Sequence, residues 1–282
     1  MKVFTEKFTL TNSLNKIRSD QKQIGLVPTM GALHAGHLSL VSQAMSENDQ
    51  VVVSIFVNPT QFDNAADLSK YPRELETDLE MLEELSADIW IYHPEPEDLY
   101  DGVVQSTAYD FGNLETVMEG QFRTGHFDGV GSVLNLLFRA VGPNRAYFGE
   151  KDYQQLLIVR KLVEIEQLEV DIIGCPIYRE ENGLAMSSRN KRLSEKGLEQ
   201  GALIHQSLNW ARSNFDRLSL AEIKQGVAER FEKQPEFELE YFEIARADNL
   251  DTVTDNGSET ACRGFIAAFL EEVRLIDNMA LN

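Results

Sequence analysis

The sequence predicts an α/β fold, with a Rossmann-like open parallel sheet in an N-terminal domain and a smaller α+β C-terminal domain that contains an antiparallel sheet. Three observations support this prediction. Apolar runs alternate with segments of helical spacing through the first two thirds of the chain. One of these runs is apolar almost throughout, as in strands covered on both faces. After residue 190, strand-like runs follow one another across short turns. The length of 282 residues suits about two domains, and we place them at residues 1–183 and 184–282.

The first strand–helix unit begins near residue 24. Residues 24–27 form a short apolar run typical of a buried parallel strand, and we expect Pro28 to end it. Gly31 and Gly36 then allow the backbone to come close to a ligand. From about residue 34 onward, apolar residues recur at helical spacing, at Leu38, Val41 and Met45.

The alternation of strands and helices continues along the chain. We predict strands at 51–59, 87–94, 145–148 and 170–173, a helix at 73–85, and another helix that carries Leu156, Leu157, Val159 and Val163. Ligands of open parallel sheets bind beyond the carboxyl ends of the strands. Four segments leave from such ends, namely 28–37, 58–62, 149–155 and 178–189.

The pattern changes after Asn190. Residues 194–216 and 220–233 have helical spacing, and three strand-like runs follow at 237–250, 261–270 and 271–281. Because no helix separates these three runs, we expect them to form an antiparallel sheet.

The acidic composition limits the possible partners. A formal net charge of −20 argues against a nucleic-acid partner, because phosphate backbones are bound by basic patches. Cys175 and Cys262 lie far apart in apolar surroundings, which favours two buried thiols in a reducing compartment. No apolar run reaches the length of a membrane span and no signal-like segment opens the chain. We therefore expect a cytoplasmic protein with no membrane partner.

Two histidines stand at the predicted start of the first helix of this unit. Backbone N–H groups at a helix start are unpaired and carry partial positive charge, so a phosphate is stabilised there. His34 and His37 can donate hydrogen bonds to phosphate oxygens from one face of the opening turn. Two alternatives remain. The pair could bind a metal, although His93, His126 and His205 offer no further ligand at suitable spacing, or both could be polar residues on a surface helix.

Two further segments carry groups suited to phosphates. In the GEKD turn at 149–152, Lys151 can neutralise a phosphate and Gly149 keeps the approach open. Asp152 either caps the next helix or accepts hydrogen bonds from ribose hydroxyls. The glycine spacing of a P-loop is absent.

The MSSRN segment at 186–190 offers two hydroxyls and a guanidinium, a donor-rich set for triphosphate oxygens. The alternative is an ordinary polar turn before a helix capped by Ser194.

Together these motifs resemble the pantothenate synthetase (pantoate–β-alanine ligase) family of the nucleotidylyltransferase superfamily. The likeness covers nearly the whole chain, through PTMGALHAGH, SIFVNPTQF, YPR, RTGHFDGV, YFGEKDYQQ, GLAMSSRN and RLIDN. It implies an ATP-dependent condensation of (R)-pantoate with β-alanine to pantothenate through a pantoyl adenylate, with release of AMP and pyrophosphate. It also implies ATP as a co-substrate, Mg²⁺ bound through the ATP phosphates, and a homodimer.

The resemblance assigns roles to individual residues. Those implied to act in catalysis are His34, His37 as the proton donor, and Lys151. The positions implied to bind ATP are Met30, Gly31, Ala32, Leu33, His34, Ala35, Gly36, His37, Gly149, Glu150, Lys151, Asp152, Tyr178, Met186, Ser187, Ser188 and Arg189. The positions expected to hold pantoate and β-alanine are Gln61, Gln155, Asn58, Pro28, Thr29 and Met30.

Two positions depart from the family pattern. Ala35 stands where an acidic residue is common, and EGQFR at 119–123 lacks the serine that often precedes the arginine. An acid at position 35 would interact favourably with the helix dipole by about 0.3–1 kcal/mol. Neither departure removes a predicted catalytic group. The predicted helix at 73–85 is rich in acidic residues, which we interpret as a solvated face: Glu74, Glu76, Asp78, Glu80, Glu83 and Glu84.

Two other functions fit the same ATP-binding motifs. One is a tRNA-acting or other nucleotide-activating relative, which the acidic charge and the lack of an anticodon-reading domain oppose. The other is a catalytically silent nucleotide-binding module. Such a module would be expected to lack a phosphate-contacting group, and none is missing from the motifs above.

Overall fold

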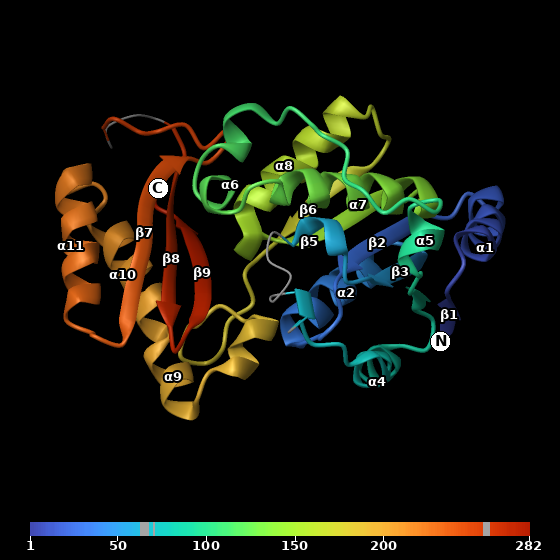
Figure 1. Ribbon diagram of the computed structural model, residues 1–282, viewed down its shortest axis with the longest axis horizontal. Coiled ribbons are helices and arrows are strands. Elements are labelled where there is room, and N and C mark those ends of the chain that lie inside the picture. Colours follow the sequence, from blue (N-terminus) through green and yellow to red (C-terminus); the bar gives the residue numbers. More distant parts are fainter. Residues whose placement is uncertain (63–67, 70, 256–259) are drawn as a thin grey trace.

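The N-terminal part is built on one parallel sheet. The structure is a computed structural model that describes residues 1–62, 68–69, 71–255 and 260–282. Its larger sheet has the order β1-β4-β3-β2-β5-β6, and every strand pair in it is parallel. The strands are β1 (Lys2–Phe4), β2 (Ile24–Thr29), β3 (Gln50–Ile55), β4 (Trp90–Tyr92), β5 (Arg145–Gly149) and β6 (Asp171–Cys175). The predicted open parallel sheet is therefore confirmed (Figure 1).

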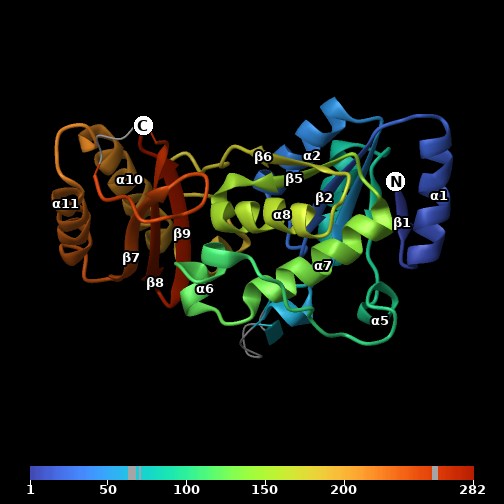
Figure 2. The same cartoon turned by 90° about the horizontal axis from the view of Figure 1, so that it is seen from above.

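Helices cover both faces of this sheet. α1 (Lys7–Ser19), α7 (His126–Val141) and α8 (Tyr153–Ile165) pack on the face that presents Leu26 and Val52. α2 (Ala35–Glu47) packs on the opposite face (Figure 2). α4 (Leu75–Leu85) packs on that face as well, against Val27 and Val53. Neighbouring residues of a strand point to opposite faces of the sheet. Because helices cover both faces, residues on both faces are apolar, which explains the continuous apolar runs. The short elements are α5 (Pro96–Leu99), α6 (Glu119–Phe122) and the 3₁₀ turns η1 (Pro59–Gln61), η2 (Gly112–Glu115), η3 (Glu150–Asp152) and η4 (Ser188–Arg192).

The C-terminal part has its own sheet. β7 (Phe237–Arg246), β8 (Cys262–Leu270) and β9 (Val273–Ala280) form an antiparallel sheet in that order, as predicted. α10 (Ala202–Asn214) and α11 (Leu220–Glu232) pack on the face that lies away from the N-terminal part (Figure 1). The other face turns Phe265 towards Leu157 and Met118 of the N-terminal part. The two sheets are thus joined by a small apolar contact beside α8.

Several predicted boundaries are wrong: the strands predicted at 87–94 and 237–250 span only Trp90–Tyr92 and Phe237–Arg246, and the predicted ends of β2 and β3 differ as well. Pro28 does not end β2, which continues to Thr29 in register with Ile55. Residues 24, 26 and 28 direct their backbone groups towards β5, since the Ile24 carbonyl accepts from Asn144 N, but pairing with β5 stops at Leu26. The missing N–H of Pro28 therefore costs no sheet hydrogen bond.

Another wrong boundary is that of β3, which ends at Ile55 rather than 59. The chain turns into η1 at that point, because the Asn58 side chain accepts from Thr60 N. In the C-terminal part, the segment predicted as helical at 194–216 is divided into α9 (Glu195–Gln200) and α10 at Gly201, a poor helix former.

Three further features of the fold concern the cysteines, the lengths of the helices and the connection between the two sheets. Cys175 and Cys262 are buried free thiols in two separate apolar clusters, as predicted. Within the described ranges, no helix is both long and apolar enough to cross a membrane. The chain passes from the first sheet to the second between the end of β6 and the start of α9, and the domain boundary at 183/184 falls in that segment, where it stays a prediction.

Candidate active site

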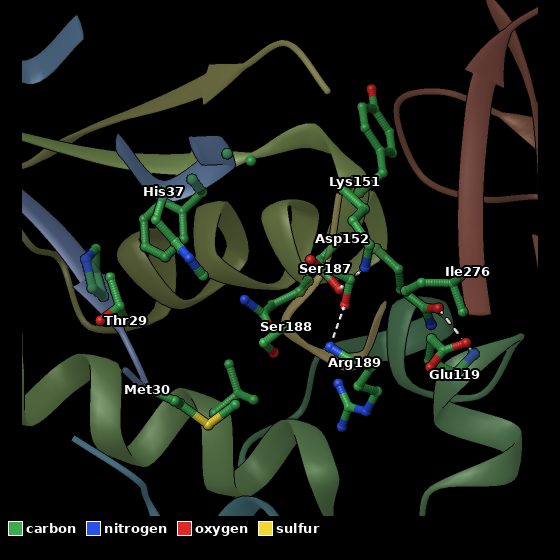
Figure 3. Close-up of a pocket in the computed structure, with 18 of the residues that line it drawn as sticks. Thr29, Met30, His37, Glu119, Lys151, Asp152, Ser187, Ser188, Arg189 and Ile276 are labelled. Atoms are coloured by element: carbon green, nitrogen blue, oxygen red, sulfur yellow. Dashed lines mark hydrogen bonds and ion pairs between the residues drawn. The ribbon is translucent and has the colours of Figure 1, made fainter. Parts of the chain in front are cut away.

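A pocket lies at the carboxyl ends of β2 and β5, where the strand order changes direction. Ligands of doubly wound sheets bind at this switch point. Segments from the whole chain meet here, from Thr29 after β2 to Ile276 of β9 (Figure 3). Asp277 and Asn278 of β9 also line the pocket. The predicted residues that line it are Pro28, Thr29, Met30, His34, Gly36, His37, Gln61, Gly149, Lys151, Asp152, Gln155, Tyr178, Met186, Ser187, Ser188 and Arg189. The predicted residues outside this lining are Gly31, Ala32, Leu33, Ala35, Asn58 and Glu150.

The loop between β2 and α2 is held from behind by a buried carboxylate. Asp78 of α4 is 1% exposed, and its two oxygens accept from Ala32 N at 2.9 Å and Leu33 N at 2.7 Å. The interpretation of Asp78 as part of a solvated face is therefore wrong. Gly31 and Ala32 both have positive φ, a conformation that is costly for alanine. The two hydrogen bonds to Asp78 stabilise this strained turn, which leads directly to His34.

The rings of the two histidines pack against each other at a tilt of 32° at the start of α2. Their ring centroids are 4.0 Å apart, and a Cβ on Gly36 would lie only 2.9 Å from the His34 ring, so glycine allows this packing. Burial lowers the pKa of His34 to about 4, and it lowers the pKa of His37 to about 3. Both rings are therefore neutral at pH 7, and each can still donate one hydrogen bond. The Nδ1 atoms of both rings are buried and have no hydrogen-bond partner among the described residues.

The GEKD turn brings Lys151 to the pocket from the end of β5. A Cβ built on Gly149 would meet no atom within 4 Å, so this glycine leaves open space beside the turn. The Lys151 ammonium lies 3.7 Å from the Asp152 carboxylate. Asp152 occupies the N-cap position of α8, but its side chain makes no capping hydrogen bond and is 49% exposed. A side-chain cap is thus not formed, and the ribose contact stays a prediction.

The MSSRN segment lies across the start of α2. Met186 N donates to the Tyr178 carbonyl at 3.0 Å, and Gly36 N donates to the Met186 sulfur at 3.3 Å. Ser187 caps η4 by accepting from Arg189 N. Ser194 caps α9, as the polar-turn alternative supposed, and this is compatible with Ser187, Ser188 and Arg189 lining the pocket. Among the residues that the structure describes, no group of three or more His, Cys, Asp or Glu side chains could hold a metal ion.

The glutamine side of the pocket depends on α7 and its first residue. Gln61 Nε2 donates to the Met30 sulfur at 2.8 Å, and Asn58 Nδ2 donates to Gln61 Oε1 at 3.3 Å. Asn58 therefore stands behind Gln61. His126, which is 6% exposed, donates from Nδ1 to the Gln61 carbonyl at 2.8 Å. α7 approaches η1 closely because residue 129 is glycine, where a Cβ would lie 2.3 Å from the Thr60 carbonyl oxygen.

The burial of His126 should make the stability of the protein depend on pH. Burial, and then the charge of Arg123, lower its pKa to about 4. As the pH falls below about 6.5, the unfolded chain gains a proton that native His126 does not take up until about pH 4, so stability is lost in this window. We expect the free energy of unfolding, measured in urea at pH 7, 6 and 5, to fall by about 1 kcal/mol per pH unit more steeply in the wild type than in His126→Gln. Equal slopes would contradict this assignment.

The chain matches one known protein family over nearly its full length. The family model described as Pantoate-beta-alanine ligase matches residues 2–280. The chain belongs to the pantoate–β-alanine ligase family.

Individual members of this ligase family are similar to the chain over its full length. The chain is 51% identical to pantothenate synthetase from Christiangramia forsetii and 48% identical to that from Flavobacterium psychrophilum, with all of each chain covered. Pantothenate synthetase from Thermus thermophilus has a similar structure, with a TM-score of 0.92, 39% identity and coverage of 100% and 99% of the two chains. Pantoate-beta-alanine ligase from Francisella tularensis was solved in complex with beta-gamma ATP and beta-alanine. Its structure matches with a TM-score of 0.81 and 35% identity, and the match covers 100% of this chain and 98% of that chain.

Proposed function

We propose that this pocket is where the ligase condenses (R)-pantoate with β-alanine at the expense of ATP, by way of a pantoyl adenylate. The observation that carries the proposal is that the three segments expected to contact phosphates meet at one switch point of the sheet. His34 and His37 follow β2, Lys151 follows β5, and the MSSRN segment contacts the start of α2. The complex of the Francisella tularensis relative with a nucleotide and beta-alanine supports the same substrates for this chain.

In the first step, the pantoate carboxylate attacks the α-phosphorus of ATP and pyrophosphate leaves. The protein contributes position and charge stabilisation rather than a covalent intermediate of its own. Lys151 offers a positive charge, and the neutral rings of His34 and His37 offer N–H donors to the phosphate oxygens. We assign Ser187, Ser188 and Arg189 to the departing pyrophosphate, since hydroxyl and guanidinium donors suit its oxygens.

Pantoate is proposed to lie on the α7 side of the pocket. Gln61 and Gln155 can both donate and accept, so they can bind hydroxyl groups and a carboxylate without adding charge. Val130, Val133 and Leu134 of α7 form an apolar lining next to them, which suits the two methyl groups of pantoate.

In the second step, the β-alanine amine attacks the acyl carbon of the adenylate. The C–N bond forms as the C–O bond to the phosphate breaks, so AMP retains one oxygen of the original carboxylate. Pantoate labelled with ¹⁸O in its carboxylate should therefore give AMP with one labelled oxygen, which mass spectrometry measures. Unlabelled AMP would rule out the adenylate route.

A prediction for Gln155 follows from its assigned contact. We expect Gln155→Ala to raise the KM for pantoate by about 10-fold, the loss of roughly one hydrogen bond, with a much smaller change for ATP. Steady-state kinetics with each substrate varied in turn measures this. Gln225→Ala, an exposed glutamine on α11, is the matched control and should leave both constants unchanged. An equal rise in both KM values would argue against a pantoate contact.

Mg²⁺ is proposed to enter with ATP. The side chains assigned to the phosphates are donors or cations, namely histidine, lysine, serine and arginine, whereas Mg²⁺ prefers oxygen ligands and keeps several waters. They fit phosphates that already carry the ion, and the ion would supply charge neutralisation there. The residues of this chain hold the phosphates themselves.

We also propose a homodimer and a cytoplasmic location. The homodimer rests on the family resemblance, and the cytoplasmic location rests on the two buried free thiols. For a chain of 31.9 kDa, light scattering during size-exclusion chromatography should give about twice this mass. A mass of one chain would contradict the dimer.

A further inference from the structure

The end of β9 reaches into the pocket from the C-terminal sheet. Asp277 and Asn278 are 4% and 2% exposed, and both line the pocket together with Ile276. They are the last two residues of the RLIDN motif at 274–278, to which the proposed reaction steps assign no role. Because neighbouring strand residues point to opposite faces, the two side chains leave β9 on opposite sides.

Asn278 binds the turn that carries Lys151. Its Nδ2 donates to the Glu150 carbonyl and to the Lys151 carbonyl, each at 2.9 Å. These two carbonyls belong to the peptide planes before and after the Lys151 Cα atom. Since both planes are held by one amide group, the backbone torsions of Lys151 are restrained, and with them the direction of its Cα–Cβ bond, from which the side chain starts.

A second side chain holds Asn278 in this orientation. Arg263 donates to Asn278 Oδ1 and to the Glu150 carboxylate, and its guanidinium lies 3.8 Å from the centroid of the Tyr153 ring. An amide turned the other way would place its oxygen against two carbonyls and its NH₂ against a guanidinium, so only one orientation is satisfied.

Asp277 holds the other ATP segment. Its carboxylate accepts two hydrogen bonds from Arg179, at 2.6 and 3.0 Å, and Arg179 also donates to the Gly183 carbonyl at 3.0 Å. Arg179 follows Tyr178 directly and pairs with Ala185, next to Met186. Adjacent residues of β9 thus bind the Lys151 turn and the segment around Tyr178 and Met186, the two segments proposed to surround the nucleotide.

We propose that Asn278 is a positioning residue for adenylate formation, which it serves by fixing the Lys151 turn. This inference rests on the role of Lys151 given under the proposed function. The C-terminal sheet, by this contact, sets where the ammonium stands relative to the α-phosphate.

Asn278→Asp tests the inference with an isosteric change. The carboxylate cannot donate to the two carbonyls, while Arg263 can still donate to one of its oxygens, so folding should be preserved. Pantoate-dependent exchange between pyrophosphate and ATP should slow by about 10- to 100-fold, as expected for a displaced catalytic group. Conversion of preformed pantoyl adenylate and β-alanine into pantothenate should change less than about 3-fold, whereas a merely structural defect would lower both rates equally.

A double-mutant cycle separates this inference from the proposed role of Lys151. If Asn278 acts through Lys151, Asn278→Asp should slow exchange less than about 2-fold in a Lys151→Ala background. A full additional loss there, or an equal loss in both half-reactions, would overturn the inference and leave the role of Lys151 standing. If Lys151→Ala alone leaves exchange unchanged, the proposed role of Lys151 fails first. Asn214→Asp is the matched control, because that asparagine also donates to a backbone carbonyl, Trp210 O, but lies in α10 outside the pocket; it should leave exchange unchanged.

Discussion

Lys151→Ala is expected to slow adenylate formation by about 10²–10³-fold, the usual cost of removing one group that stabilises developing transition-state charge. Lys151 lines the pocket from the turn after β5, at the switch point of the sheet, and its side chain is mostly buried. A positive charge in that setting is poorly screened by water, so its effect on the α-phosphate is large. Pantoate-dependent exchange between pyrophosphate and ATP measures the step directly.

The control for Lys151 lies on the helix that follows the same turn. Lys161 of α8 is exposed and pairs with Glu164 at 3.0 Å, so Lys161→Ala should keep the wild-type exchange rate. If Lys151→Ala exchanged pyrophosphate as fast as this control, the lysine would have no part in the transition state.

Asp78→Asn should have the second largest effect, on both stability and activity. The amide keeps one acceptor, but its NH₂ group then faces a backbone N–H of the Ala32–Leu33 pair, which leaves that buried donor unsatisfied. We expect a loss of about 1–3 kcal/mol in the free energy of unfolding, measured in urea at pH 7. Because the same loop carries His34, exchange activity of the folded enzyme should also fall by about 10-fold or more.

Glu80→Gln gives the matched comparison for Asp78. Glu80 lies on the exposed side of the same helix and should tolerate the change within about 0.5 kcal/mol. An Asp78→Asn enzyme with wild-type stability and exchange rate would show that the carboxylate does not hold the loop.

The sheet and the segments proposed to bind phosphate could be predicted because their signals are local. Residues 24–27 and 51–55 form nearly continuous apolar runs, which predicts strands covered on both faces, and the motifs at 34–37 and 149–152 follow strand ends. The pocket brings together most of the residues that these motifs predicted. Their individual roles stay predictions until the variants are measured.

The contacts that hold those segments could not be predicted, because they depend on residues distant in sequence. Asp78 sits among five other acidic residues of one helix region, and nothing local indicates that it alone turns inward to Ala32 and Leu33. Asn278 reaches the Lys151 turn across 127 residues of chain. α7, with twelve buried residues, is not among the predicted elements, yet it forms one wall of the pocket.

Pro28 shows a second limit of local rules. Proline is a reliable strand breaker only where its N–H would have been used, and that depends on the neighbouring strand. Here β5 has already stopped pairing at Leu26, so β2 continues. As a consequence, Pro28 and Thr29 extend the strand into the lining of the pocket.

The central claim, that this pocket joins pantoate to β-alanine through an adenylate, is tested most directly by AMP release. Enzyme, ATP and Mg²⁺ are incubated with pantoate, with β-alanine, with both, or with neither, and AMP and pyrophosphate are quantified. We expect sustained AMP release only with both substrates, and a single burst of pyrophosphate, about one per active site, with pantoate alone. AMP release that does not depend on pantoate, or no release in any mixture, would contradict the account.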